Sequence, residues 1–154
     1  MGILESLKGQ VIVSSQAMPD EPLYKEECMN AMIQSVLKGG AKALRLAGAR
    51  DIKNAKKFTD VPIIGLTKPE VIPKNWKQIV YITPGMKEIS ELISAGADII
   101  AMDGTSRPRG NDNLRKLIKY VDIHKKASMA DISTLSEAVA ARALGFDMIS
   151  TTLS

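Results

Sequence analysis

The stretch GADIIAMD (residues 96–103) decides the fold, because it joins a helix-ending glycine to a short apolar run that stops on a carboxylate. The same order recurs in GAKALR (residues 40–45) and GFDMIST (residues 145–151). Such joins between a helix end and a buried strand are typical of repeated βα units in a parallel sheet. The repeat therefore predicts an α/β protein with right-handed crossovers between successive strands.

Six short apolar runs are predicted to be strands, at residues 11–13, 41–46, 61–66, 98–102, 128–132 and 148–151. Each run ends on polar or charged side chains: Ser14-Ser15-Gln16, Arg45, Lys68, Asp103, Asp131 and Thr151-Thr152. In a (β/α) barrel the carboxyl ends of the strands form the rim where chemistry takes place. We expect these side chains to meet there. Six units make either part of an eight-stranded barrel or an open doubly wound sheet, and the pattern alone does not separate the two.

Helices are predicted between the strands. An apolar stripe at helical spacing covers residues 29–37 and is stopped by Gly39 and Gly40. Asp51 is predicted to cap one helix, Thr83 another with Pro84 at its first position, and Thr134 a third through a capping box with Glu137. Residues 69–81 contain two prolines and the only tryptophan, and are predicted to form a long, mobile rim loop.

Composition narrows the class of protein. The chain has 154 residues, 45% of them hydrophobic and 25% charged, and a net charge of +4 that suits a small anionic substrate. Its basic residues are scattered and only six residues are aromatic, which argues against nucleic acid. A single cysteine, Cys28, excludes an internal disulfide and fits a reducing, cytoplasmic compartment. Because there is no signal peptide and no apolar run of membrane-spanning length, we expect no membrane association.

The usual nucleotide-binding, zinc-protease and serine-hydrolase motifs are absent from the sequence. With one cysteine and one histidine, His124, which is placed at the tail of a helix away from the rim, the chain is not expected to hold zinc. Asp103 and Asp131 could contribute to a hard-cation site, but nothing in the sequence requires one. No metal is therefore predicted.

Lys68 is the sharpest catalytic candidate. It follows an apolar run and precedes Pro69, so its amine is expected at a partly dry rim, where desolvation lowers the pKa of a lysine. A neutral amine can remove a carbon-bound proton or attack a carbonyl. The alternative is a surface lysine that begins a loop.

Arg45 ends a strand among apolar residues, and a buried arginine needs an anionic partner. That partner is either the substrate or one of Asp103 and Asp131. Asp131 could alternatively cap the helix that follows it, and Gln16 could hold an amide or hydroxyl or cap its own loop. Arg107 and Arg109, which follow Asp103, form either a solvated cationic loop or an anion contact for a sugar phosphate.

Seven stretches together resemble the bacterial N-acetylmannosamine-6-phosphate 2-epimerase family. They are VIVSSQAMPDEPLY (Val11–Tyr24), GGAKALR (Gly39–Arg45), VPIIGLTK (Val61–Lys68), YITPGMKEISEL (Tyr81–Leu92), GADIIAMDGTSRPR (Gly96–Arg109), MADIST (Met129–Thr134) and GFDMISTTLS (Gly145–Ser154). The resemblance runs in order through essentially the whole chain. It favours a (β/α)8 TIM-barrel type over an open sheet.

The resemblance implies an epimerase that interconverts N-acylmannosamine 6-phosphate and N-acylglucosamine 6-phosphate in the breakdown of amino sugars such as sialic acid. A proton leaves C2 of the open-chain sugar and returns on the other face, and no redox cofactor is needed. Lys68 matches the family's catalytic lysine. Gln16, Arg45 and Asp131 match substrate-contacting positions, and Asp103 matches the aspartate of the D-x-T loop.

Some positions depart from the family's pattern. Ser15 stands where cysteine is frequent, Ala47 stands where a polar residue is found, and Pro69 replaces an arginine. The family continues beyond the STTLS motif into two further βα units that carry a catalytic glutamate and phosphate-binding loops. Residues 1–154 are therefore expected to form one partial barrel domain that lacks these units. We expect it to form a homo-oligomer or to pair with a second chain that completes the barrel.

Two other functions stay open at this point. The chain could be a catalytically incomplete fragment that binds a sugar phosphate. It could also be a different phosphosugar barrel enzyme that uses its lysine, for example to form a Schiff base.

Overall fold

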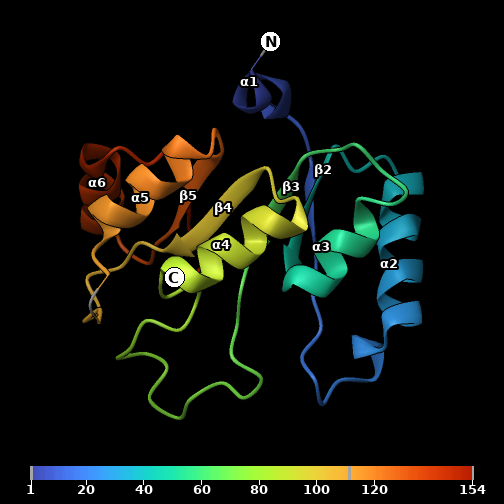
Figure 1. Ribbon diagram of the computed structural model, residues 1–154, viewed down its shortest axis with the longest axis horizontal. Coiled ribbons are helices and arrows are strands. Elements are labelled where there is room, and N and C mark those ends of the chain that lie inside the picture. Colours follow the sequence, from blue (N-terminus) through green and yellow to red (C-terminus); the bar gives the residue numbers. More distant parts are fainter. Residues whose placement is uncertain (1, 111, 154) are drawn as a thin grey trace.

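A computed structural model describes residues 2–110 and 112–153 of the chain. Within these ranges six strands form one sheet in the order of the sequence (Figure 1). The strands are β1 (Ile12–Ser15), β2 (Ala43–Ala47), β3 (Ile63–Leu66), β4 (Ile99–Asp103), β5 (Ala127–Asp131) and β6 (Met148–Ser150). Every neighbouring pair is parallel. The strand order never reverses, as it would in a doubly wound sheet, so the sheet is an incomplete barrel of the TIM type.

Helices connect the strands and lie against the outer face of the sheet (Figure 1). They are α2 (Glu26–Lys38), α3 (Ala49–Ala55), α4 (Met86–Ala95), α5 (Leu114–Ile123) and α6 (Leu135–Leu144), with the 3-10 helix η1 (Pro22–Tyr24) before α2. A short helix, α1 (Ile3–Leu7), lies at the opposite end of the molecule from the long loop between β3 and α4 (Figure 1). Across residues 2–110 and 112–153, none of the helices has the length and apolar character needed to cross a membrane.

Both faces of the sheet are buried, because side chains alternate between them along each strand. One core lies between the sheet and the helices and includes Leu44, Leu46 and Ile100. The second core lies on the inner face and includes Ala43, Leu66 and Met129, together with Leu7 of α1. Burial on both faces explains why the strands read as continuous apolar runs, as expected for a parallel sheet.

The predicted helix ends are confirmed where a local signal defines them. Gly96 and Gly145 follow α4 and α6 with φ of 100° and 103°, a left-handed conformation that glycine adopts without strain. The capping box of Thr134 and Glu137 is present at the start of α6. Residues 69–81 contain neither helix nor strand, as predicted.

Two predicted caps are wrong. Helix α3 starts after Gly48, so Asp51 lies in its first turn, where its carboxylate accepts a hydrogen bond from Arg50 Nε at 2.8 Å. Helix α4 starts after Gly85, and Thr83 instead accepts a hydrogen bond from the backbone N–H of Thr67 at 3.0 Å. Thr83 is thus held by a residue remote in the sequence, whereas Asp51 is held by its immediate neighbour in the first turn of a helix that starts earlier than predicted.

Three strands, β1, β2 and β4, extend further towards their carboxyl ends than the apolar runs suggested, while β3 ends as predicted and β5 and β6 end one residue earlier. Ser15 pairs in register with Leu46, and Asp103 pairs with Asp131. Ladder pairing depends on the neighbouring backbone and not on side-chain polarity, so the strands continue through these polar residues. Arg45, Asp103 and Asp131 are therefore part of the sheet and held rigidly by it.

Candidate active site

Alternation along the strands brings the predicted rim residues to the inner face of the sheet. Arg45 lies two residues after Ala43 of the inner core, and Asp131 lies two residues after Met129 of the same core. Residues two apart in a strand share a face, so both side chains point into the barrel. Lys68 continues the same alternation two residues after Leu66, just beyond the end of β3.

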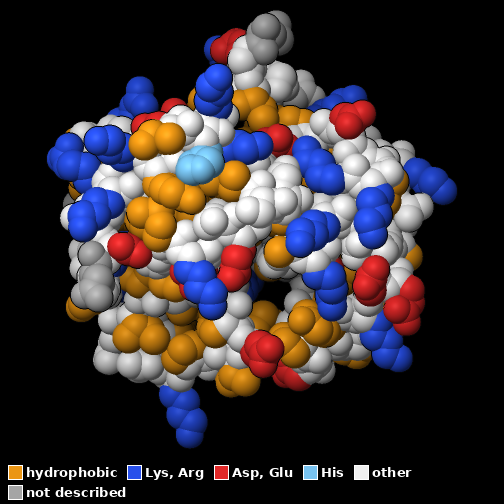
Figure 2. Space-filling model, viewed as in Figure 1, with side chains coloured by type: hydrophobic (Ala, Val, Ile, Leu, Met, Phe, Trp, Pro, Cys, Tyr) orange, Lys and Arg blue, Asp and Glu red, His pale blue; other side chains and the backbone are white. Residues whose placement is uncertain are grey.

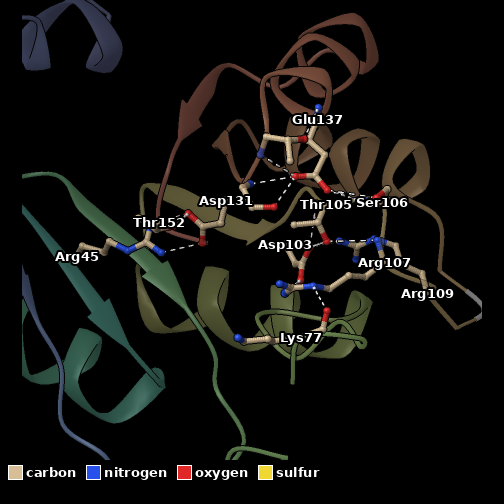
Figure 3. Close-up of polar contacts among 12 residues, drawn as sticks. Arg45, Lys77, Asp103, Thr105, Ser106, Arg107, Arg109, Asp131, Glu137 and Thr152 are labelled. Carbon is tan, nitrogen blue, oxygen red and sulfur yellow. Dashed lines mark hydrogen bonds and ion pairs between the residues drawn. The ribbon is translucent and has the colours of Figure 1, made fainter. Parts of the chain in front are cut away.

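Arg45 and Asp131 form a bidentate pair in the barrel interior (Figure 3). Arg45 Nη1 donates to Asp131 Oδ1 at 3.0 Å, and Nη2 donates to Oδ2 at 2.7 Å. The hydroxyl of Thr152 also donates to Oδ1, at 2.7 Å. Of the anionic partners that the sequence left open for Arg45, the structure shows Asp131. The alternative role of Asp131 as a helix cap is wrong, because Thr134 and Glu137 cap α6 and the Asp131 carboxylate faces Arg45.

Asp103 is a buried acceptor at the neighbouring strand end. Its Oδ1 accepts from the N–H and the hydroxyl of Thr105 at 2.8 and 2.6 Å, and its Oδ2 accepts from Arg107 Nη1 at 3.3 Å. Arg109 Nη2 lies 3.9 Å from Oδ1. The side chains of Arg107 and Arg109 are only 12% and 10% exposed, so the expectation of a solvated cationic loop is wrong.

Glu137 accepts hydrogen bonds from several residues, although the sequence predicted only its role in the capping box. Its carboxylate accepts hydrogen bonds from the N–H and hydroxyl groups of Ser106 and Ser133 and from the N–H of Thr134, at 2.8–3.2 Å (Figure 3). Burial alone would raise the pKa of Glu137, but these hydrogen bonds outweigh it and lower the pKa to about 2. Glu137 therefore ties the loop after β4 to the start of α6.

Residues 81–83 form a second feature that sequence reasoning missed. The N–H of Asp103 donates to the carbonyl of Ile82 at 3.2 Å, and the N–H of Thr83 donates to the carbonyl of Thr67, also at 3.2 Å. The segment therefore bonds on one side to the residue after β3 and on the other side to the last residue of β4. This arrangement brings Tyr81 to the same open end of the barrel as Lys68, and this end is called the mouth below.

Lys68 lines a cavity of about 680 Å³. The walls come from the loops after β1, β2 and β3 and from the start of α4, and include Met18, Tyr24, Pro69 and Tyr81. A hollow ringed by acidic, basic and apolar side chains is visible below the position of α4 (Figure 2). The cavity is large enough for a small phosphorylated metabolite.

Burial lowers the pKa of Lys68, and the positive charge of Arg45 lowers it further, while Glu21 and Asp131 act in the opposite direction. The predicted direction of this shift is confirmed. Arg45 and Asp131 do not line the Lys68 cavity themselves. Both nevertheless act on the amine electrostatically, so the buried pair lies close to Lys68.

Gln16 follows β1 next to this mouth, and only one end of its side-chain amide makes a hydrogen bond within the described residues. Its Nε2 donates to Ser14 Oγ at 2.7 Å, while its Oε1 is buried and has no hydrogen-bond partner among the described residues. An unsatisfied buried acceptor is costly, so this oxygen is suited to a ligand N–H or hydroxyl.

His124 does not line this cavity, as expected. It lies at the end of α5, where its Nδ1 is within hydrogen-bonding distance of the Tyr120 carbonyl. Within the part of the chain that the structure describes, no group of three or more metal-ligating side chains comes together.

Comparison with known proteins identifies the family. The family model NanE, described as putative N-acetylmannosamine-6-phosphate epimerase, matches residues 29–154. A putative N-acetylmannosamine-6-phosphate 2-epimerase from Clostridium perfringens strain 13 is 43% identical over 154 residues, which cover 99% of this chain and 67% of the relative. A protein of the same description from Clostridioides difficile strain 630 is 42% identical with the same coverage. The chain thus spans about two thirds of the length of these relatives.

Solved structures agree with this assignment. The N-acetylmannosamine-6-phosphate 2-epimerase from Clostridium perfringens superposes with a TM-score of 0.91 at 41% identity, covering 100% of this chain and 66% of that one. A dihydropteroate synthase from Xanthomonas albilineans superposes with a TM-score of 0.57 at 13% identity, covering 94% of this chain and 60% of that one. The second match shows a shared fold only. From the family model and these relatives, we conclude that the chain belongs to the NanE family of N-acetylmannosamine-6-phosphate epimerases.

Proposed function

We propose that this chain carries the Lys68 part of an active site that interconverts N-acylmannosamine 6-phosphate and N-acylglucosamine 6-phosphate. The observation that carries the proposal is the placement of Lys68, which lines a cavity of about 680 Å³ and whose pKa is lowered mainly by burial. Membership of the NanE family supplies the substrate class. The net charge of +4 is consistent with a phosphorylated substrate.

Lys68 is the general base in this proposal. A lowered pKa increases the fraction of neutral amine near neutral pH, and only the neutral amine can accept a proton. The amine removes the proton from C2, which is acidic because it is adjacent to the C1 carbonyl of the open-chain sugar. The electron pair of the C–H bond then forms an enolate. Return of a proton to the other face of C2 completes the epimerisation.

The other predicted residues divide into two groups. The free Oε1 of Gln16 is proposed to accept a hydrogen bond from an N–H or hydroxyl of the sugar. Arg45 and Asp131 are already paired with one another, and Asp103 is paired with Arg107. In this proposal these four residues shape and charge the mouth. Arg107 would contact a phosphate only by leaving Asp103, whereas the side-chain nitrogens of Arg109 have no hydrogen-bond partner among the described residues and could make the contact directly.

Exchange of the C2 hydrogen in deuterated buffer, followed by NMR, tests the role of Lys68. The unmodified chain should introduce deuterium at C2 of N-acetylmannosamine 6-phosphate, and Lys68→Ala should not. Lys119→Ala, which removes an exposed lysine from α5, is the matched control and should exchange like the unmodified chain. Equal exchange by the unmodified chain and Lys68→Ala would remove Lys68 from the mechanism.

The internal pairing of Arg45 with Asp131 and of Asp103 with Arg107 favours a second candidate, a chain that binds a sugar phosphate without turning it over. Calorimetry separates the two candidates, since measurable affinity without C2 exchange would favour the second. A Schiff-base mechanism is tested by borohydride, which would trap a substrate adduct on Lys68 only if an imine forms.

Association with a further polypeptide is part of the proposal. Strands β1 and β6 each pair with a single neighbour among the described residues, and such edges invite association. Close to the β6 edge, Leu135, Val139 and Ile149 are 81%, 63% and 37% exposed. Size-exclusion chromatography with light scattering should show a species larger than 16.7 kDa, whereas a single monomeric peak would contradict the association.

A further inference from the structure

Tyr81 lies at the mouth of the barrel, in the segment that links β3 to α4. The backbone bonds of Ile82 and Thr83 fix it between the ends of β3 and β4, and its side chain lines the same cavity as Lys68. The Tyr81 ring packs against the inner core and edge-on against Trp76, with ring centroids 6.3 Å apart and planes at 81°. The ring is therefore held from two sides, in a residue that lines the Lys68 cavity.

Two arginines near the mouth already use their guanidinium groups, whereas Arg109, whose side-chain nitrogens have no hydrogen-bond partner among the described residues, lines a separate pocket. Arg45 donates with both terminal nitrogens to Asp131. Arg107 donates to Asp103 and to the carbonyl of Lys77, the latter at 3.1 Å. The Tyr81 hydroxyl, by contrast, makes no hydrogen bond to any residue within 2–110 and 112–153. It is a half-buried donor with no acceptor of its own.

Removing a proton next to a carbonyl requires more than a base. Negative charge develops on the carbonyl oxygen as the C–H bond breaks, and a donor aimed at that oxygen stabilises the transition state more than the ground state. The mouth contains a base, Lys68, and needs such a donor.

We propose that Tyr81 is a further catalytic residue, whose hydroxyl donates a hydrogen bond to the C1 oxygen of the open-chain sugar while Lys68 removes the C2 proton. This inference rests on the proposed function. In the step, the C2 proton passes to the Lys68 amine, which becomes an ammonium ion. The C–H electron pair forms the C1–C2 double bond, and the carbonyl π pair moves onto the C1 oxygen facing Tyr81. The reverse of the step returns a proton that has exchanged with solvent.

The environments of the two residues suit these roles. Burial raises the pKa of Tyr81, against the opposing effect of Arg107, so the phenol keeps its proton and remains a donor. Burial shifts the pKa of Lys68 in the other direction and favours the neutral amine. Burial therefore favours an acid and a base among the residues that line one cavity.

Tyr81→Phe tests the inference, because it removes the hydroxyl and keeps the ring that packs on Trp76. We expect the maximal rate of C2 deuterium exchange to fall about 100-fold, the typical effect of removing one oxyanion donor, while the concentration of sugar phosphate that gives half-maximal exchange changes less than threefold. Tyr120→Phe is the matched control, because Tyr120 lies on α5 and packs on His124. It should exchange like the unmodified chain.

The pH profile separates a chemical role from a structural one. In the unmodified chain the exchange rate should fall at high pH, as the Tyr81 phenol loses its proton, and Tyr81→Phe should lose this alkaline limb. Exchange by Tyr81→Phe within twofold of the unmodified chain, or an unchanged alkaline limb, would overturn the inference and leave the role of Lys68 intact. Absence of exchange in the unmodified chain would instead overturn the proposed function.

Discussion

Arg45 and Asp131 face each other across the barrel interior, from strands that are not neighbours in the sheet. Their side chains meet at 2.7 and 3.0 Å although the residues are 86 positions apart, and strands β3 and β4 lie between β2 and β5 in the sheet. Asp131 is fully buried and Arg45 is 9% exposed. The pair therefore links two sides of the barrel close to Lys68.

Removing the charge of one partner of this ion pair should strongly destabilise the fold. Asp131→Asn leaves the buried Arg45 charge without an anionic partner, and we expect it to lower the free energy of unfolding by about 3 kcal/mol. Urea denaturation measures the change. Asp122→Asn removes an exposed carboxylate from α5 and should change stability by less than about 0.5 kcal/mol. A loss of under 1 kcal/mol in Asp131→Asn would mean that solvent reaches Arg45.

Glu137 should make stability depend on acid. Its folded pKa of about 2 lies below the usual value of 4.5, so its contribution is complete above pH 4.5 and is lost as the pH falls towards 2. Glu137→Gln should lower the free energy of unfolding at pH 7 by about 1 kcal/mol, a value reduced for the partial exposure of the side chain.

The dependence on pH distinguishes this effect from simple loss of contacts. The gap in stability between the unmodified chain and Glu137→Gln should narrow as the pH is lowered below 4.5, in urea titrations at several pH values. Glu27→Gln, at an exposed position of α2, serves as the control. A gap that stays constant down to pH 2.5 would contradict the lowered pKa.

Lys68 should give the proposed exchange reaction an acidic limb. The rate is expected to rise with pH as the amine loses its proton and to level off below the ordinary lysine pKa of 10.5, because burial and Arg45 lower the pKa of Lys68. Burial of the charged amine also costs stability below its folded pKa, so Lys68→Met should unfold at a higher urea concentration at pH 7. A rate that rises only above pH 10 would show an unshifted amine.

Arg50 should hold the loop after β1, which lines the Lys68 cavity. Its Nε donates to Asp51 at 2.8 Å, its Nη2 donates to the carbonyl of Tyr24 at 2.8 Å, and its guanidinium lies 4.2 Å from the centroid of the Tyr24 ring. Arg50→Ala leaves the buried Asp51 carboxylate without this partner, and we expect a loss of about 2 kcal/mol in urea denaturation. Arg115→Ala, at an exposed arginine, is the control, and equal effects of the two changes would refute a specific role.

Gly65 should tolerate no side chain. A Cβ there would lie 2.8 Å from Ala97 Cβ and 2.9 Å from Ile52 Cδ1, in the packed layer between β3 and the helices. Gly65→Ala is expected to cost about 1–3 kcal/mol by overpacking, measured by thermal or urea unfolding. Gly2→Ala, where nothing lies within 4 Å of the added Cβ, should be neutral. A neutral Gly65→Ala would show that the layer can relax.

Local signals predicted the elements well. The apolar runs found all six strands, and the glycines at residues 96 and 145 marked the ends of α4 and α6. These features depend on neighbours within one turn or one strand, so a short window of sequence contains the information. The predicted cap at Thr83 failed because its partner, Thr67, is remote in the sequence, and the cap at Asp51 failed because α3 starts earlier, after Gly48.

The sequence by itself determined that Lys68, Arg45, Asp103 and Asp131 follow apolar runs and so share one rim, since parallel strands end together. Only the tertiary structure decided which charges pair, because Arg45 could meet either carboxylate until the curvature of the sheet placed β5 opposite β2. The same is true of Tyr81, which reaches the Lys68 cavity through the backbone bonds of the segment between β3 and β4. Contacts of this kind depend on distances between residues that are remote in the chain, and no local pattern encodes them.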